Sequence, residues 1–388
     1  MIYLDNAATT KTREEVVESM IPYFNEKWHN PSSLYSPSVK IKKDIEKARE
    51  NVGNFIGANK NEIYFCSCGS EANCMVLQGF VKQCHFDNIR PIIITSTIEH
   101  KSILDCANDL KDLKYADIYF VGVDNKGLID LNELEYLLKK ASKKGKILVS
   151  LQFANNEIGS CQIIKTISDL IHKYDGIFHT DAVQCVGQIP INVNELGIDA
   201  LSMSGHKIKA PKGIGFLYKK NGISIKPLIY GSQEQGLRGG TTNTYGIVGL
   251  SKAIEYCDVS CEHIEEVINK RNYFVNLLET KFGCKLNGHN EYRLPNNINV
   301  VFPQDITGES LLYTLDLSGI EIATGSACNS QSIKPSHVLK AIGLTDEEAM
   351  KTVRFTLSDD VTYEDIDYVI DEIDKAIKVI YSLKGSEN

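Results

Sequence analysis

Short apolar runs alternate with helical stretches between about residues 38 and 250, and this alternation constrains the fold of the chain more than any other feature. A continuous apolar run of roughly four to eight residues is typical of a strand buried on both faces of a parallel sheet. We expect such strands at Ile63–Cys66, Ile92–Thr95, Ile147–Phe153, Ile177–Thr180, Ala200–Met203 and Gly215–Tyr218. The alternation predicts an α/β fold with a large, mainly parallel sheet and helices on both faces.

Helical signals separate these strands. Apolar residues recur at steps of three and four over residues 41–55, and another helix is expected to start at Ser70. Asp130, with Glu133 three residues later, is typical of a capping box that opens a helix through Leu138.

The pattern changes after about residue 257. The elements expected there are a strand, a helix, a second strand and a terminal amphipathic helix: Asn297–Phe302, Ser310–Leu317, Thr352–Leu357 and a helix with its apolar face at 366–377. We therefore predict a large domain over residues 15–257 and a smaller α+β domain made from residues 1–14 and 258–388.

Composition excludes several classes of protein. The net charge of -8 and the pI of about 5.7 argue against a bulk nucleic-acid binder. We expect no secretory signal, because no basic stretch followed by an apolar core is visible, and no apolar run approaches the roughly 18 residues that could span a membrane. Eleven cysteines at irregular spacings favour reduced thiols in a cytoplasmic protein over a disulfide framework.

Lys207 is the first candidate for catalysis, because it lies in the run Ser204-Gly205-His206-Lys207. A lysine amine can form a Schiff base with a carbonyl group when burial or nearby positive charge keeps it neutral. Ser204 and His206 could hold a phosphate beside it. Lys209 and Lys212 are competing candidates, and a solvated basic loop is the alternative interpretation.

A second segment, Cys68 to Asn73, lies between a strand and a helix. Gly69 and Ser70 would present backbone N–H groups and a hydroxyl to an anion such as phosphate, although a simple helix cap has the same pattern. Cys66 and Cys68 have no second cysteine pair at zinc-site spacing, so we expect no metal site.

Further polar residues follow expected strands, where open parallel sheets bind ligands. Asp181 could keep a pyridine nitrogen protonated, and Asn155 and His100 share the same edge. Arg354, inside an apolar strand, could bind a substrate carboxylate. A helix-capping Asp, a structural His and a buried ion pair are the respective alternatives.

Cys328 follows the small residues of Ala323-Thr324-Gly325-Ser326-Ala327, a run that we expect to be a flexible loop. A thiol on such a loop can reach both a buried site and an external acceptor. It becomes nucleophilic only as the thiolate.

Read in order, these segments resemble the cysteine desulfurases of the NifS/IscS type, in the class V branch of the fold-type I pyridoxal-phosphate enzymes. The resemblance covers nearly the whole chain, from Tyr3 to Leu357. Its motifs are the segments 3–10, 30–33, 155–159, 204–207, 233–241, 325–328 and 354–357. One such motif is weak, but the ordered set is specific.

The resemblance implies a role for each candidate residue. Lys207 would hold pyridoxal 5'-phosphate covalently and move protons at the substrate α-carbon, and Cys328 would be the sulfur nucleophile. The phosphate would be bound by Gly69, Ser70, Ser204 and His206, and by Thr241 of a neighbouring subunit in a homodimer. His100 would stack on the ring and take part in catalysis, Asp181 would pair with the ring nitrogen, and Asn155 and Gln184 would lie near the ring oxygen. Arg354 and Asn30 would clamp the carboxylate of L-cysteine.

The implied reaction takes sulfur from L-cysteine, releases L-alanine and leaves a persulfide on Cys328. The sulfur would pass to an acceptor protein, such as an iron–sulfur scaffold or a transfer-RNA thiolation protein, and neither nucleic acid nor a membrane is expected as a partner. The chain departs from the family pattern at Tyr35, where the family often has His, and after Arg354.

Rival interpretations remain. A class V aminotransferase would transfer nitrogen and would not need Cys328, and a non-catalytic scaffold would need none of Lys207, Asp181 and Cys328. A selenocysteine lyase fits the same motifs. A dinucleotide-binding domain does not, because Tyr218 stands where a third glycine would be required.

Overall fold

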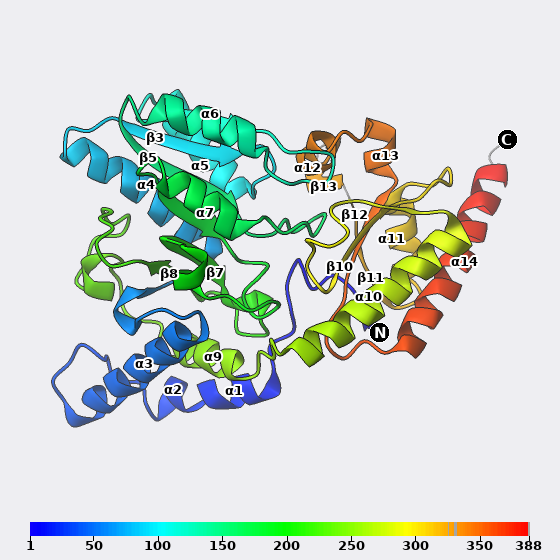
Figure 1. The fold of residues 1–388 in the computed structure, drawn as a ribbon. Coiled ribbons are helices and arrows are strands. Elements are labelled where there is room, and N and C mark those ends of the chain that lie inside the picture. Colours follow the sequence, from blue (N-terminus) through cyan, green and yellow to red (C-terminus); the bar gives the residue numbers. More distant parts are fainter. Residues whose placement is uncertain (325, 330–331, 387–388) are drawn as a thin grey trace.

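The computed structural model describes residues 1–324, 326–329 and 332–386. The strands of its large sheet are Ile63–Cys66 (β2), Pro91–Ser96 (β3), Asp117–Val121 (β4), Lys146–Gln152 (β5), Ile177–Asp181 (β6), Ala200–Ser204 (β7) and Gly215–Lys219 (β8). Within the described chain this sheet has seven strands, in the order β2-β8-β7-β6-β5-β3-β4 (Figure 1). The neighbours from β4 to β7 pair in parallel, and β8 runs antiparallel to both β7 and β2. The predicted α/β fold with a mainly parallel sheet is confirmed.

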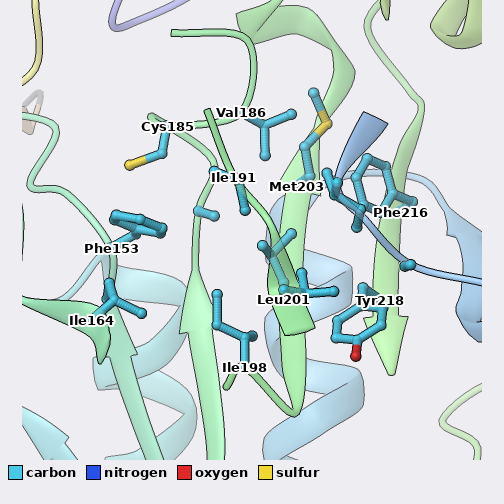
Figure 2. Packing of buried hydrophobic residues seen from close by; sticks show 14 of the residues in the cluster. Phe153, Ile164, Cys185, Val186, Ile191, Ile198, Leu201, Met203, Phe216 and Tyr218 are labelled. Atoms are coloured by element: carbon cyan, nitrogen blue, oxygen red, sulfur yellow. The ribbon is translucent and has the colours of Figure 1, made fainter. Parts of the chain in front are cut away.

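Helices cover both faces of this sheet because successive strand side chains point in opposite directions. Ile92 and Ile94 belong to one hydrophobic cluster, whereas Ile93 belongs to the cluster on the other face. The first face is covered by Ser36–Phe55 (α3), Leu131–Ala141 (α6), Ile164–His172 (α7) and Thr244–Glu255 (α9). The second is covered by Gly69–Phe86 (α4) and Lys101–Asp112 (α5). Figure 2 shows part of the first cluster, in which Leu201, Met203 and Phe216 are fully buried.

Two local predictions need correction. β4 was not expected from the sequence, although Ile118–Val121 is itself a continuous apolar run. Asp130 does cap α6 by accepting hydrogen bonds from the backbone N–H groups of Asn132 and Glu133. The Glu133 carboxylate, however, accepts from the N–H of Gly122 at 2.7 Å, so the reciprocal bond of a capping box is replaced by a contact with the strand region.

A second, antiparallel sheet with the order β12-β15-β10-β9 lies apart from the large sheet, among the C-terminal elements (Figure 1). Its strands are Ala323–Thr324 (β12), Thr352–Thr356 (β15), Asn297–Val301 (β10) and Lys285–Leu286 (β9). The hydrophobic core there includes residues of Cys261–Phe282 (α10), Gly308–Asp316 (α11) and Tyr363–Ser386 (α14). Leu4 also belongs to this core, next to a parallel pair formed by Ile2–Tyr3 (β1) and Ile320–Glu321 (β11). The domain boundaries at residues 14 and 257 stay a prediction.

Shorter elements complete the described chain. They are Glu14–Met20 (α1), Pro22–Asn25 (α2), Val193–Leu196 (α8), Ser326–Asn329 (β13), Ser332–Pro335 (β14), His337–Ala341 (α12), Asp346–Met350 (α13), Lys60–Glu62 (η1), Gly205–Lys207 (η2) and Glu234–Gly236 (η3). Within these residues, no helix combines the length and the apolar character needed to cross a membrane.

Candidate active site

A cavity of about 440 Å³ lies at the carboxyl ends of the parallel strands. β5, β6 and β7 end at Gln152, Asp181 and Ser204, and all three residues line it. This is the edge at which open α/β sheets bind their ligands. The predicted site residues in its lining are Gly69, Ser70, His100, Asp181, Gln184, Ser204, His206, Lys207 and Arg354. The structure therefore brings together most of the residues chosen from the sequence.

Lys207 lies on η2, directly after β7. Its Nζ donates hydrogen bonds to the carbonyl oxygens of Ala7 and, at 2.7 Å, Ala8. Burial, with a smaller effect of the nearby positive charge of Arg354, lowers the pKa of the Lys207 amine to about 8. A substantial neutral fraction is then present near neutral pH, as attack on a carbonyl group requires. The alternative Lys209 pairs with Asp359 at 2.6 Å.

The floor of the cavity carries the carboxylate of Asp181, which is 8% exposed. Its Oδ1 accepts from the backbone N–H of Val183 at 3.0 Å, and its Oδ2 accepts from Asn73 Nδ2 at 2.7 Å. The carboxylate is thus held in place by two donors in a buried setting. This fits a partner for a protonated ring nitrogen better than a free helix cap.

Another part of the cavity lining can take an anion. Gly69 and Ser70 form the N-terminus of α4, an 18-residue helix, where backbone N–H groups and the helix dipole favour negative charge. A Cβ at Gly69 would lie 2.6 Å from Val183 Cγ2, so only glycine lets the backbone approach so closely. Burial, then the charges of Lys207 and Lys212, lower the pKa of His206 to about 4, which makes it a neutral hydrogen-bonding group.

His100 is the N-cap residue of α5, so its position follows from the strand–helix connection after β3. Its Nδ1 accepts from the backbone N–H of Ser102 at 3.2 Å and lies 2.8 Å from the Ser102 hydroxyl. The imidazole is therefore fixed from the side of Nδ1 while it lines the cavity.

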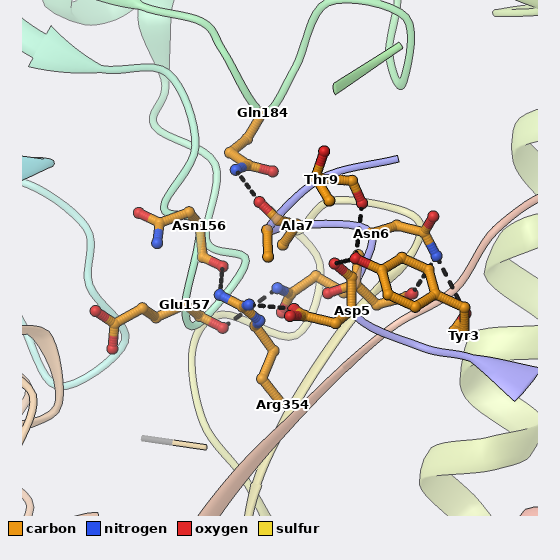
Figure 3. A network of polar contacts seen from close by, with 12 residues as sticks. Tyr3, Asp5, Asn6, Ala7, Thr9, Asn156, Glu157, Gln184 and Arg354 are labelled. Atoms are coloured by element: carbon orange, nitrogen blue, oxygen red, sulfur yellow. Dashed lines mark hydrogen bonds and ion pairs between the residues drawn. The ribbon is translucent and has the colours of Figure 1, made fainter. Parts of the chain in front are cut away.

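Arg354 comes from the middle of β15, between Asn299 on β10 and Ala323 on β12. Its Nη2 donates to Asp5 Oδ1 at 2.5 Å, and its Nη1 donates to the carbonyl oxygen of Asn156 at 2.9 Å (Figure 3). Among the described residues, no hydrogen-bond partner lies next to the buried Nε. The guanidinium group is thus held by an ion pair and still has donors that a carboxylate could use.

Gln184 and Asn155 differ in placement. Gln184 lines the cavity and donates from Nε2 to the carbonyl oxygen of Ala7 at 3.1 Å (Figure 3). Asn155 is fully buried next to the cavity, where its Nδ2 donates to the Ile98 carbonyl and its Oδ1 accepts from the N–H groups of Glu157 and Ile158. These bonds shape the turn that follows β5, and a cofactor contact by Asn155 stays a prediction.

Two predicted residues, Asn30 and Thr241, are not among the residues that line this cavity, and a third, Cys328, is described only by its backbone. Asn30 is exposed, and its Oδ1 accepts from the backbone N–H of Ser32 at 2.9 Å. Thr241 is exposed and lines a separate cavity of about 280 Å³. The backbone of Cys328 lies in β13, which pairs antiparallel with β14, whereas a loop was expected. Its side chain, and Gly325, lie outside the described residues.

Sequence reasoning missed three polar residues of the site. Asn73 and Gln152 are buried and line the cavity, and Asn73 Oδ1 and Gln152 Nε2 have no hydrogen-bond partner in the described chain. Asp5 holds Arg354. Asn73 follows Ser70 by about one helical turn, so the spacing could have found it. Nothing local signals Asp5, since its partner is 349 residues away.

Together these groups fit pyridoxal 5'-phosphate. The cavity combines an anion site at a helix N-terminus, a carboxylate, a lysine with a lowered pKa and two buried polar atoms without partners. Such unsatisfied buried atoms are costly unless a ligand completes their hydrogen bonds. Among the described residues, no group of three or more His, Cys, Asp or Glu side chains could hold a metal ion.

Comparison with known proteins gives a consistent result. The family model for aminotransferase class-V matches residues 2–369. A protein of Dictyoglomus turgidum named cysteine desulfurase IscS is 44% identical over 385 residues, which cover 98% of this chain and 96% of that protein.

Solved structures agree with the sequence relatives. A NifS-like protein is 34% identical, covers 98% of this chain and 99% of its own, and superposes with a TM-score of 0.88. SspA in complex with cysteine is also 34% identical, with 92% of this chain and 99% of that chain covered and a TM-score of 0.80.

Proposed function

The chain belongs to the cysteine desulfurases of the aminotransferase class-V family, and we propose that it converts L-cysteine to L-alanine and keeps the sulfur as a persulfide on Cys328. The observation that carries the proposal is one cavity that holds Lys207, Asp181 and Arg354 together. The cavity thus combines an amine, a carboxylate and a guanidinium group that can bind the carboxylate of a substrate.

The cofactor of the proposed reaction is pyridoxal 5'-phosphate. When bound, it supplies an electron sink for the charge that develops at the substrate α-carbon. We propose that Lys207 is the residue to which it is covalently attached and that Asp181 pairs with its ring nitrogen. Asn155 and Gln184 would contact the ring oxygen. The phosphate is assigned to Gly69, Ser70, Ser204 and His206.

Residues around the substrate have separate tasks. Arg354, oriented by Asp5, binds the carboxylate of L-cysteine, with Asn30 as a second contact. Lys207, once free, removes and returns the proton at the α-carbon, and its pKa of about 8 suits both directions near neutral pH. His100 lines the same cavity and is the second group that can hold a proton there.

Cys328 acts on the sulfur of the substrate. Its thiolate forms the new S–S bond while the bond between sulfur and the substrate β-carbon breaks, and that carbon takes up a proton. One L-cysteine and one thiol therefore become one L-alanine and one persulfide, without an external oxidant or reductant.

The proposal extends to the assembly and the setting. We infer a homodimer in which Thr241 reaches the phosphate bound to the partner subunit, and its exposure on this chain leaves it available for that contact. The large domain would comprise residues 15–257 and the small domain residues 1–14 and 258–388. The persulfide would pass in the cytoplasm to a protein acceptor that serves iron–sulfur cluster assembly or transfer-RNA thiolation.

The test is the release of alanine from L-cysteine, with a thiol reductant present, by the parent protein and by Cys328→Ala. We expect steady release by the parent and almost none by the variant. Cys261→Ala is the matched control, because Cys261 is an exposed free thiol at the start of α10. Equal release by parent and Cys328→Ala would indicate a lyase that needs no protein thiol. No alanine from either would favour an aminotransferase or a non-catalytic scaffold.

A further inference from the structure

Four side chains, three of which line the cavity, form a continuous chain of hydrogen bonds. Asn73 Nδ2 lies 2.7 Å from Asp181 Oδ2 and 2.9 Å from Ser102 Oγ. Ser102 Oγ in turn lies 2.8 Å from His100 Nδ1. Asp181 ends β6, Asn73 lies on α4, Ser102 lies on α5 and His100 caps α5. The chain therefore connects the carboxylate in the cavity floor with the imidazole at the rim.

The direction of these hydrogen bonds follows from the chemistry of the groups. The amide nitrogen of Asn73 has two hydrogens and accepts none, so one hydrogen goes to Asp181 and the other to Ser102. A flipped amide would place its oxygen against the Asp181 carboxylate, which excludes the reverse assignment. The Ser102 hydroxyl accepts from Asn73 and keeps its own hydrogen for a bond to His100.

His100 Nδ1 receives donors from two parts of one residue. The backbone N–H of Ser102 donates to it at 3.2 Å, and the Ser102 hydroxyl lies at 2.8 Å. A ring nitrogen that accepts a hydrogen bond carries no proton, so the proton of the neutral ring is on Nε2. Nε2 is then a hydrogen-bond donor on a residue that lines the cavity.

Burial makes this chain hard to rearrange. Asn73 is 1% exposed and Asp181 is 8% exposed, so neither has water as an easy substitute partner. Removing Asn73 or Asp181 leaves a buried partner unsatisfied, which costs more than the bond itself contributes, whereas His100 at the end of the chain is exposed. We call this chain of four side chains, Asp181, Asn73, Ser102 and His100, the relay, and we expect it to behave as a unit.

We propose that Asn73 and Ser102 are positioning residues that hold His100 in the Nε2–H tautomer and tie its orientation to that of Asp181. The proposal deepens the cysteine desulfurase reaction, and its catalytic consequence rests on that proposed function. The two residues keep a defined donor, the Nε2–H group, available on His100 in the cavity lining; Asn73 also lines the cavity, whereas Ser102 acts only through His100.

The first test reads the tautomer directly, by nitrogen-15 NMR of the histidine rings in the holoenzyme, with the His100 signal identified by its loss in His100→Gln. We expect an unprotonated, hydrogen-bonded Nδ1 and a protonated Nε2. In Ser102→Ala the Nδ1 signal should move toward that of a free unprotonated nitrogen, and Ser102→Thr should restore it. The backbone N–H of residue 102 is present in every variant, so the comparison isolates the hydroxyl group. A protonated Nδ1 in the parent, or identical Nδ1 signals in all three proteins, would overturn the proposal.

The second test uses alanine formation from L-cysteine. Ser102→Ala and Asn73→Ala should each lower kcat about tenfold with little change in KM, because the substrate clamp is untouched. Ser102→Thr should retain most of kcat. The double variant should lose no more than the worse single variant, as expected for one connected unit. Multiplying losses would show two independent supports and would contradict the relay. The NMR result on the parent needs no turnover, so an inactive parent would refute the proposed function without deciding the relay.

Discussion

The large parallel sheet and the small antiparallel sheet contribute to the cavity in different ways. The large sheet brings in Gln152, Asp181 and Ser204 at the ends of β5, β6 and β7. The small sheet brings in Arg354 from the middle of β15, flanked by β10 and β12. Residues at the ends of parallel strands meet by topology alone, whereas a charged residue within a strand must be held by a specific partner.

The partner is supplied by the first residues of the chain. Asp5 pairs with Arg354, and Asn6 Nδ2 donates to the carbonyl oxygen of Thr356 at 2.9 Å (Figure 3). Thr10 Oγ1 donates to the carbonyl oxygen of His206 at 2.9 Å, beside Lys207. The N-terminal segment of residues 3–10 therefore connects the clamp on the small sheet with the lysine on the large sheet.

The largest effect is expected on the large-sheet side, from Lys207→Ala. The loss of the only amine assigned to proton transfer should lower kcat for alanine formation by about 10³-fold or more. Lys209→Ala is the control, because Lys209 is paired with Asp359 away from the reaction. Losses of similar size in both variants would contradict the assignment.

A smaller and different effect is expected on the small-sheet side, from Arg354→Lys. A lysine cannot keep the geometry with Asp5, with the Asn156 carbonyl and with a substrate carboxylate at once. We expect KM for L-cysteine to rise about 30-fold, with kcat less affected. Arg90→Lys, at an exposed pair with Asp117, should leave both constants unchanged. A fall in kcat without a change in KM would remove Arg354 from substrate binding.

Removing a link of the N-terminal segment should have a weaker effect. Asn6→Ala deletes the hydrogen bond to Thr356, two residues from Arg354, and such a bond contributes about 1 kcal/mol. We expect KM for L-cysteine to rise by about fivefold. An unchanged KM, with the protein fully folded by circular dichroism, would show that the clamp does not depend on this segment.

The smallest expected effect concerns the lysine and pH. Burial lowers the pKa of Lys207 to about 8, so the neutral amine is complete above that pH and becomes scarce below it. The rate at which cofactor-free protein takes up pyridoxal 5'-phosphate, followed by visible absorbance, should therefore reach half of its maximum near pH 8 and level off at higher pH. A rate that keeps rising beyond pH 10 would mean that the amine is not buried as described.

The large-sheet and small-sheet regions also differ in how much of their structure could be predicted from the sequence. Strands such as β5 and β6 were predicted from mostly apolar segments between helical stretches, and their ends located Asp181 and the region around Asn155. β4, at the edge of the sheet, was missed although Ile118–Val121 is also an apolar run, so this signal alone does not find every strand. The pairing of Asp5 with Arg354 could not be predicted, since their separation of 349 residues is bridged only by the folded arrangement of these regions.

The central claim is that sulfur leaves the substrate onto Cys328, and peptide mass spectrometry tests it most directly. The protein would be treated with L-cysteine in the absence of reductant, alkylated and digested. We expect one added sulfur atom on the peptide that contains Cys328. Added sulfur on the peptide of Cys68 instead, a thiol residue that lines the cavity itself, or on no cysteine at all, would contradict it.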